Sequence, residues 1–302
     1  MTLKSDIERT KKVASDLILA YHTSEFFTRL KKPDYSPPSG VSIGSVEHIV
    51  FLTLTLSIDP LGDTPEIWDA SRDAYDDERT RYLFSPDALC DESSELIIRD
   101  LKKAGVSVRQ KNDADNWRNV GVSISRRWGG DPGNFIISHH GNARKILDYM
   151  RADQFGERND FPQIIGEKKG TLWISLLKDY AGYDLFCNLD KIPLKADIHI
   201  IRSSIALGLV SGKYSGQLQV ISRLIGELWR DAFEDYETEG KNITALDVSA
   251  PLLNLSKSGC NKRDGKRVIC PEYKECPLNS YCINGLFSIG LDGVIMDTNT
   301  EL

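Results

Sequence analysis

Residues 161–170 read FPQIIGEKKG, a short segment that separates two stretches of helical patterning. Proline and glycine interrupt helices, so the segment predicts a turn between two helices, a helical hairpin at 161–175. A glycine-centred turn of this kind can point backbone N–H groups at a phosphate, and the dipole of the following helix adds to the attraction. The candidate phosphate contacts in this segment are Gly166, Lys169 and Gly170.

The rest of the chain is also dominated by helical periodicity, and we expect an all-α fold with about ten helices. Segment 46–58 allows two interpretations, because Leu52, Leu54 and Leu56 alternate with polar residues as in a strand. The chain offers few partners for such a strand, which favours a buried helix. The turn Gly129–Gly133 ends one of the other helices. Helices are expected at 5–31, 46–58, 92–104, 113–128, 134–152, 218–233 and 243–256.

The composition is that of a soluble globular protein. Of the 302 residues, 40% are apolar and 27% are charged, which excludes a disordered or collagen-like chain. The longest apolar candidate, 49–58, is about half as long as the roughly 18 residues that a membrane span needs. The first residues are polar and lack the apolar core of a signal peptide. We therefore expect a cytoplasmic protein with reduced thiols and no membrane partner.

The formal net charge of −6 argues at first against a nucleic-acid partner. This total comes from one stretch, 59–97, in which 12 Asp and Glu residues outnumber three Arg residues and give a local net charge of −9. The remainder of the chain therefore carries +3. The most basic short stretch, 257–267, has a net charge of +4 and is either a phosphate-binding loop or a solvated one. Its candidate DNA contacts are Lys257, Lys262, Arg263, Lys266 and Arg267.

Four of the six cysteines lie within 23 residues near the C-terminus, whereas Cys90 and Cys187 are isolated. Nine, five and five residues separate the four, and four thiolates can ligate a [4Fe–4S] cluster or a single zinc ion. Zinc sites usually take their ligands in pairs two to four residues apart. Because this segment contains no such pair, its spacing favours the cluster. The candidate ligands are Cys260, Cys270, Cys276 and Cys282.

Residues 192–202 read IPLKADIHIIR, an extended apolar run that turns into a helix at Asp197. Aspartate is a favoured N-cap residue, because its carboxylate accepts hydrogen bonds from the first unpaired N–H groups of a helix. Taken alone, Asp197 is therefore either an ordinary helix cap or a carboxylate that takes part in chemistry.

Together, the hairpin, the aspartate and the cysteines resemble the helix-hairpin-helix DNA glycosylases, in particular the iron–sulfur branch that includes endonuclease III and the adenine glycosylase MutY. Residues 165–170 are similar to the second half of the family hairpin, Leu-Pro-Gly-x-Gly-x-Lys-x-Ala. Residues 194–202 are similar to the family's Val-Asp-Thr-His-x-x-Arg stretch, and 129–132 resembles the turn that precedes the hairpin helices. The chain departs from the pattern at Ile164, which replaces the first hairpin glycine, and in its wider cysteine spacing.

The resemblance implies two helical subdomains with the hairpin and an active-site cleft between them. We expect an N-terminal helix within 1–40 that packs with the cysteine-bearing domain. A helical barrel domain is expected at 41–186 and contains the hairpin, 161–175. A second helical domain is expected at 187–302, with the four-cysteine loop at 260–282 and a C-terminal tail.

The resemblance also implies a DNA glycosylase, an enzyme that flips a damaged or modified base out of the duplex and cleaves its N-glycosidic bond. Asp197 then stabilises the positive charge that develops on the sugar. Lys168 lines up with the family's Schiff-base lysine, which gives some members a strand-cleaving lyase activity; the alternative is that Lys168, like Lys169, contacts phosphates. The implied cofactor is a [4Fe–4S] cluster, with zinc as the alternative. The implied partner is double-stranded DNA, bound by a monomer.

Three other functions are compatible with the same residues. A hydrolase of a free modified nucleoside or nucleotide on this fold would suit the acidic total. A non-catalytic DNA-binding module would use the cysteine loop only for structure. A glycosylase of hypermodified phage bases would act in antiviral defence instead of in DNA repair.

Overall fold

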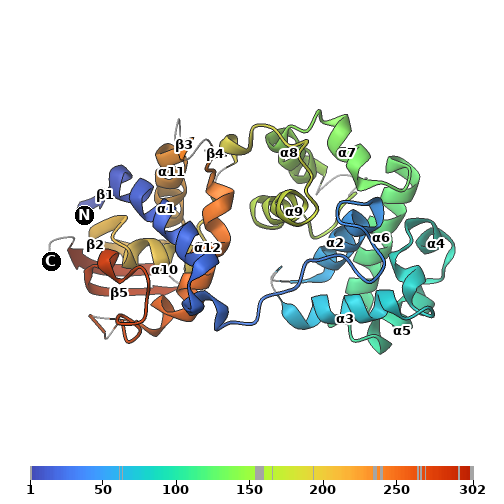
Figure 1. Cartoon of the computed structure of the whole chain (residues 1–302), viewed down its shortest axis with the longest axis horizontal. Coiled ribbons are helices and arrows are strands. Elements are labelled where there is room, and N and C mark those ends of the chain that lie inside the picture. Colours follow the sequence, from blue (N-terminus) through green and yellow to red (C-terminus); the bar gives the residue numbers. More distant parts are fainter. Residues whose placement is uncertain are drawn as a thin grey trace. The chain divides into compact units, whose positions relative to one another are not determined.

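The computed structural model is mainly helical and splits into two compact units (Figure 1). One unit is Lys31–Leu189, and the other combines Met1–Leu30 with Asp190–Leu302. The domain boundaries expected from the sequence, 40/41 and 186/187, lie ten and three residues from these divisions. The structure describes residues 2–60, 62, 64–153, 160–164, 166–192, 194–233, 237–238, 241–263, 265, 267–268, 270–291 and 293–299.

One helix, α2 (Val46–Ile58), forms the centre of the Lys31–Leu189 unit. All residues from 48 to 58 are buried, so both the apolar and the polar positions of the apparent strand alternation face other residues. Two of the buried hydroxyls bond to the helix itself: Thr53 Oγ1 donates to the Ile49 carbonyl oxygen at 2.7 Å, and Ser57 Oγ donates to that of Leu54 at 2.6 Å. The helical prediction for this segment is confirmed. Neither α2 nor any other helix in the described part of the chain is long and apolar enough to cross a membrane.

The helices around α2 follow one another closely along the chain, and α3, α6, α7 and α9 pack directly against it. A single helix was predicted at 134–152, but this prediction is wrong, because two helices divide the stretch. His140 and Gly141 separate them with φ values of 53° and 67°, and a Cβ atom on Gly141 would collide with the Leu185 carbonyl. The helices are α3 (Pro65–Asp76), α4 (Pro86–Asp91), α5 (Ser94–Lys103), α6 (Lys111–Trp128), α7 (Pro132–Ser138), α8 (Ala143–Asp153) and α9 (Gly166–Tyr180).

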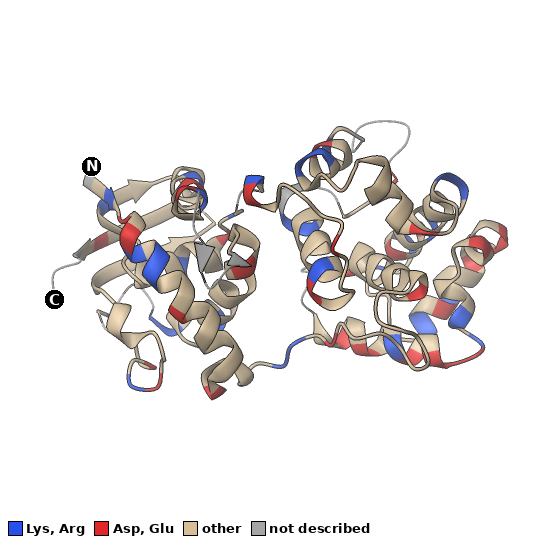
Figure 2. Ribbon diagram, turned by 45° about the horizontal axis from the view of Figure 1, so that its top comes forward, with Lys and Arg blue, Asp and Glu red and all other residues tan. Residues whose placement is uncertain are grey.

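The acidic stretch 59–97 includes α3, α4 and the first turn of α5. Helix α3 is predominantly acidic, with Arg72 as its one basic residue, and Figure 2 shows the acidic residues of the ribbon in red. Several of these charges form surface ion pairs, such as Lys31 with Asp69 (2.6 Å) and Arg72 with Asp34 (3.2 Å). Exposed pairs of this kind contribute at most about 1 kcal/mol each. Apart from the buried Asp59, the described acidic residues of the stretch are exposed or half-exposed and therefore form a solvated face.

In its described residues, the other unit is built around four α-helices and the cysteine loop. Helix α1 packs against α11 and α12, and α10 packs against α12 (Figure 1). The helix expected at 5–31 ends earlier, because Ser24 has an extended backbone and its Oγ caps a short 3₁₀ turn at Glu25–Thr28. The helices are α1 (Ile7–Thr23), α10 (Ile198–Ala206), α11 (Leu218–Phe233) and α12 (Ala245–Ser258).

A four-stranded antiparallel sheet completes this unit, so the all-α prediction was too narrow and the chain is mainly α instead. The strand after the cysteines pairs with the last strand in a hairpin that closes at Gly290 and Gly293. A separate two-stranded pair consists of β3 (Glu237–Thr238) and β4 (Lys241–Asn242). The strand order of the larger sheet is β1 (Thr2–Ser5), β2 (Val210–Gly216), β6 (Gly293–Asn299) and β5 (Asn284–Gly290).

Candidate functional site

Asp197 is the N-cap of α10, as its sequence context predicts. Its Oδ1 atom accepts hydrogen bonds from the backbone N–H groups of His199 (2.9 Å) and Ile200 (3.1 Å). The side chain is half-buried, and the positive end of the helix dipole favours a negative charge at this position. The carboxylate is therefore held in one orientation by the helix that it caps.

Helix α12 fixes the orientation of α10 through polar contacts. The buried Ser256 Oγ lies 3.3 Å from His199 Nδ1 and accepts a hydrogen bond from Arg202 Nη1 at 3.4 Å. One turn further along α10, Ser203 Oγ donates to the Leu252 carbonyl oxygen at 2.7 Å. These contacts resist rotation of α10 about its own axis, and with it movement of the carboxylate at its first turn.

Helix α11 holds the extended segment that leads into Asp197. Ser222 Oγ donates to the Ala196 carbonyl oxygen at 2.6 Å. One turn later, Gly226 is so close to this segment that a Cβ atom there would lie 2.7 Å from the Leu194 carbonyl oxygen. The two α11 residues are four apart and so lie on the same face of the helix. Together they determine where the segment approaches α10.

Gly226→Ala is expected to destabilise the protein by about 1–3 kcal/mol, because the new methyl group forces the backbone at Leu194 to move. Alanine is otherwise favoured over glycine in a helix by about 1 kcal/mol, so a net loss identifies the steric contact as its cause. Gly290→Ala is the control, since a Cβ atom there meets nothing within 4 Å. Urea unfolding of the two variants measures the difference, and equal stabilities would contradict this account of the packing.

All six cysteines lie within the described residues and are free thiols. Among the four near the C-terminus, Cys260 and Cys276 are buried, and the other two are half-buried. Burial raises the pKa of Cys260 well above its ordinary value, and the neighbouring thiols Cys282, Cys276 and Cys270 raise it further. The four thiols thus form one electrostatically coupled set, which we refer to as the cysteine cluster.

The donor chemistry of the cysteine cluster fits a group that needs four thiolates. Burial raises the pKa of Cys276 to about 12 and that of Cys282 to about 11, so the thiols are protonated at neutral pH unless a metal displaces their protons. Within the ranges that the structure describes, no three His, Cys, Asp or Glu side chains are already placed to hold a metal ion. A cavity of about 310 Å³ lies beside Cys270 and Cys282, which is more space than a single ion needs.

The basic loop presents less positive charge to solvent than its sequence predicts. Arg263, predicted to bind DNA, is instead buried. Lys262 is exposed but forms an ion pair with Glu272 at 2.7 Å, and Arg29 contacts the same carboxylate. Arg267 is exposed and Lys257 is half-buried, whereas Lys266 lies outside the described residues.

The hairpin residues differ in their surroundings. Gly166 is the first residue of α9, and Lys168 is exposed in its first turn. Gly170 is buried, and a Cβ atom there would lie 2.6 Å from Leu147 Cδ2 on α8. This close approach explains the glycine as a packing residue between α8 and α9. Ile165, within the quoted hairpin motif, lies outside the described residues.

Lys169 is the hairpin residue whose environment the sequence analysis missed. Its ammonium group is half-buried and donates a hydrogen bond to the Leu56 carbonyl oxygen at 3.2 Å. Burial lowers the pKa of Lys169 to about 8, although the carboxylate of Asp59 partly offsets this effect. Helical spacing could have predicted this burial, because Lys169 shares a face of α9 with the buried Gly170 and Trp173.

A second cation also binds the C-terminal end of α2. Arg109 Nη2 donates to the Ile58 carbonyl oxygen at 3.2 Å and forms an ion pair with the buried Asp113 at 2.8 Å. The buried Asp59 accepts hydrogen bonds from four donors, including Trp68 Nε1 at 2.9 Å. Arg109 and Lys169 place positive charge at the C-terminal end of α2 and so compensate its dipole, while the hydrogen bonds to Asp59 and the ion pair of Asp113 satisfy the buried carboxylates.

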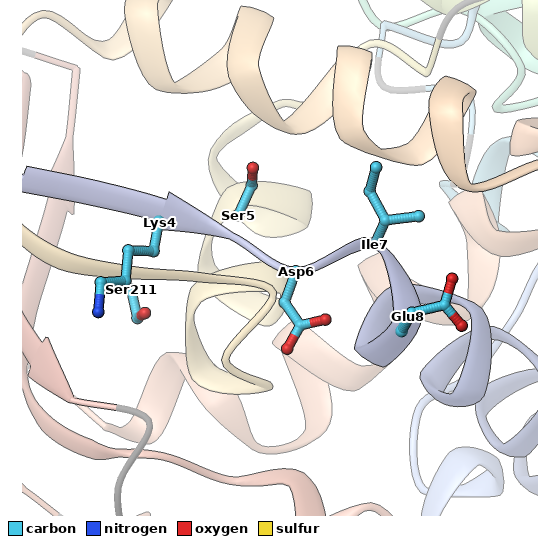
Figure 3. A pocket seen from close by; sticks show the side chains of 6 residues that line it. All are labelled: Lys4, Ser5, Asp6, Ile7, Glu8 and Ser211. Carbon is cyan, nitrogen blue, oxygen red and sulfur yellow. The ribbon is translucent and has the colours of Figure 1, made fainter.

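A second cavity, of about 330 Å³, lies where β1 meets α1 (Figure 3). It includes none of the candidate residues. Asp6 and Glu8 place two carboxylates at the start of α1, and Asp6 Oδ1 already accepts the N–H of Arg9 at 2.9 Å. Negative charge at this helix end opposes a phosphate or another anion. The cavity is lined by Lys4, Ser5, Asp6, Ile7, Glu8 and Ser211.

Comparisons with known proteins leave the family open. No protein-family model matches the sequence, and no curated protein is significantly similar to it.

Proposed function

We propose that the protein is a DNA glycosylase that removes a damaged or modified base from double-stranded DNA. The observation that carries this proposal is the placement of Asp197, whose helix is held by both α11 and α12. A carboxylate that must stabilise a transition state has to be fixed before the reaction begins. The hairpin, the aspartate segment and the cysteine loop, which resemble the iron–sulfur glycosylases, also support it.

Asp197 supplies the electrostatic stabilisation that base release requires. Cleavage of an N-glycosidic bond develops positive charge on the sugar, and a carboxylate at about 4 Å stabilises such a charge by roughly 4 kcal/mol at an effective dielectric constant near 20. The same carboxylate orients the attacking nucleophile. The flipped-out base leaves its stack at a cost of a few kcal/mol, which favours weakened or modified base pairs as substrates.

Lys168 is the proposed Schiff-base lysine. It is exposed in the first turn of α9, which makes it accessible to DNA, whereas the neighbouring Lys169 is half-buried. After the base has left, the amine would condense with the C1′ aldehyde of the abasic sugar and release water, and β-elimination would then expel the 3′-phosphate and cleave the strand.

Borohydride reduction of the protein with an abasic duplex tests this assignment, because it converts a Schiff base into a stable protein–DNA adduct. Lys168→Met is expected to lower the yield of adduct by at least about 100-fold. Lys169→Met is the matched control and is expected to keep most of the adduct, although the pKa of Lys169 is lowered to about 8. If Lys169→Met loses the adduct and Lys168→Met keeps it, Lys169 is the nucleophile.

The cysteine cluster is proposed to hold a [4Fe–4S] cluster, with zinc as the alternative. The four ligands are thiols of one loop, and bound iron and sulfide would join its ends and stabilise the fold. Two of the thiols, Cys270 and Cys282, border a cavity of about 310 Å³. Absorbance of the purified protein near 400 nm separates the two, since zinc thiolates are colourless.

Incubation with duplexes that each carry one lesion tests the proposed activity. The set includes oxidised purines, oxidised pyrimidines, deaminated or mismatched bases, alkylated bases and hypermodified phage bases. We expect abasic sites with at least one class of duplex. If no duplex acquires abasic sites, the glycosylase proposal fails.

A hydrolase of a free modified nucleoside is a second candidate, and the state of the basic loop favours it. Arg263 is buried and Lys262 is paired with Glu272, so the loop presents fewer cations to a duplex than its sequence predicts. DNA binding that weakens steeply with salt would support the glycosylase, because each phosphate contact releases a counterion. Turnover of a nucleoside with no duplex binding would support the hydrolase.

A further inference from the structure

Arg263 is a charged residue in the interior of the cysteine-bearing unit. It lies in the loop between Cys260 and Cys270, and only 2% of its surface is exposed. Its Nη2 atom donates to the Gly285 carbonyl oxygen at 2.6 Å, and its guanidinium carbon lies 4.8 Å from the centre of the Phe287 ring. Both partners are on β5, so Arg263 attaches the cysteine loop to the sheet.

These contacts leave the Nε–H donor of the guanidinium without an acceptor in the described part of the chain. Arg263 Nε is buried and has no hydrogen-bond partner among the residues that the structure describes. A buried donor without an acceptor costs about 1–3 kcal/mol, and more when the group is charged. Such a donor is expected to face an acceptor that binds there.

The surroundings of Arg263 indicate what that acceptor is. The guanidinium and the thiols Cys270 and Cys282 line the same cavity of about 310 Å³. Burial lowers the pKa of Arg263, whereas its charge interactions with Cys282, Cys260 and Cys270 raise it. Three of the four thiols are therefore within electrostatic reach of this one cation. Four thiolates with a divalent core carry a net charge of about −2, which a buried cation offsets.

Three other cations near the cysteine cluster, Arg9, Arg202 and Lys262, already have acceptors. Arg9 donates Nε to the Leu207 carbonyl oxygen at 2.8 Å and Nη2 to that of Tyr281 at 2.7 Å. Arg202 donates Nη1 to Ser256 Oγ. The exposed Lys262 pairs with a carboxylate.

We propose that Arg263 donates its Nε–H to a sulfur atom of the group bound by the cysteine cluster, and that it tunes this group instead of binding DNA. The inference rests on the proposed four-thiolate cofactor. A donor and a positive charge beside metal-bound sulfur stabilise the more reduced state and strengthen metal retention.

Arg263→Gln and Arg263→Lys test the proposal by metal retention and redox potential. Arg263→Gln keeps a polar side chain without the charge, and we expect its metal to be lost to a chelator at least about tenfold faster than in the wild type. If the metal is a cluster, its midpoint potential is expected to shift to a more negative value. Arg263→Lys keeps the charge but not the Nε donor, and an intermediate result is expected.

Arg267→Gln is the matched control, because Arg267 is an exposed arginine of the same loop. We expect it to leave chelator kinetics and potential unchanged and to weaken duplex binding, whereas Arg263→Gln changes the metal site. If Arg263→Gln loses its metal to the chelator at the wild-type rate and has the wild-type midpoint potential, the inference is overturned. If Arg263→Gln does not fold, the comparison of Arg263→Lys with wild type decides.

The same samples separate this inference from the proposed function. A wild-type protein that binds no metal overturns the cofactor and the Arg263 inference together, while Asp197-dependent base release would still support a glycosylase. A wild-type protein with bound metal but without base release overturns the glycosylase alone.

Discussion

Asp197→Asn is expected to slow base release about a thousandfold and to leave the fold intact. The asparagine oxygen still accepts the N–H groups of His199 and Ile200, and asparagine is as good an N-cap as aspartate. The substitution removes only the negative charge, which stabilises the transition state by roughly 4 kcal/mol. At about 1.4 kcal/mol for each factor of ten, this loss corresponds to about three orders of magnitude in rate. Single-turnover kinetics on the duplex that reacts fastest measures it.

Asp131→Asn is the matched control for this substitution. Asp131 is the N-cap of α7, and its Oδ1 accepts the Gly133 N–H at 2.7 Å, so the change is chemically the same at a second helix. We expect base release by this variant to stay within about twofold of the wild type. If Asp197→Asn and Asp131→Asn have equal rates, Asp197 is a helix cap alone and the catalytic assignment is wrong.

Cys276→Ser is expected to remove the bound metal and to destabilise the cysteine-bearing unit by several kcal/mol. The thiol is buried, and the backbone N–H of Leu278 donates to it and thereby favours the thiolate. Structural metal binding contributes on the order of 10 kcal/mol of folding free energy in small thiolate sites. Loss of one of four ligands should therefore abolish absorbance near 400 nm and lower the melting temperature of the purified protein.

Cys90→Ser is the control, because Cys90 is isolated in the sequence and lies in the other unit. Its metal content is expected to equal that of the wild type. If Cys276→Ser has the metal content and the melting temperature of the wild type, the four-thiolate site is wrong. If Cys90→Ser loses as much metal as Cys276→Ser, the loss of metal is not specific to the four proposed cysteine ligands.

Much of the helical architecture could be predicted because it depends on local periodicity. Apolar residues recur at helical spacing in α6 and α11, and both helices lie where the pattern places them. Helix α2 was harder, since a helix buried on all sides has no polar face and its sequence does not distinguish a helix from a strand. The scarcity of strand partners decided that prediction correctly.

The sheet was missed for a different reason. Its strands come from both ends of the chain and from the segment after α10, so local patterns do not reveal their pairing. One part of it was recognisable, because Asp292-Gly293 lies between two short apolar runs, 286–291 and 294–296, and Asp-Gly between such runs is a hairpin signal. The break between α7 and α8 depends on the contact of Gly141 with Leu185, which is likewise not a local property.

At the candidate site, the position of Asp197 followed from capping rules, but the environments of the charged residues did not. Arg263 reads as one more cation in a basic loop, yet it is buried against Phe287 of β5, a strand that was not predicted. The hydrogen-bond acceptor of Lys169, the Leu56 carbonyl oxygen, is far away in the sequence. Charge counts describe a sequence, whereas burial decides which of the charges can reach a ligand.

Mass spectrometry of the bases released from duplex DNA tests the central proposal most directly. The wild type and Asp197→Asn are incubated with the set of lesion duplexes and, in parallel, with the corresponding free nucleosides. We predict that the wild type releases at least one modified base from duplex DNA, that Asp197→Asn releases it about a thousandfold more slowly, and that the free nucleosides stay intact. Release from the nucleosides alone, or equal release by both proteins, would contradict the account.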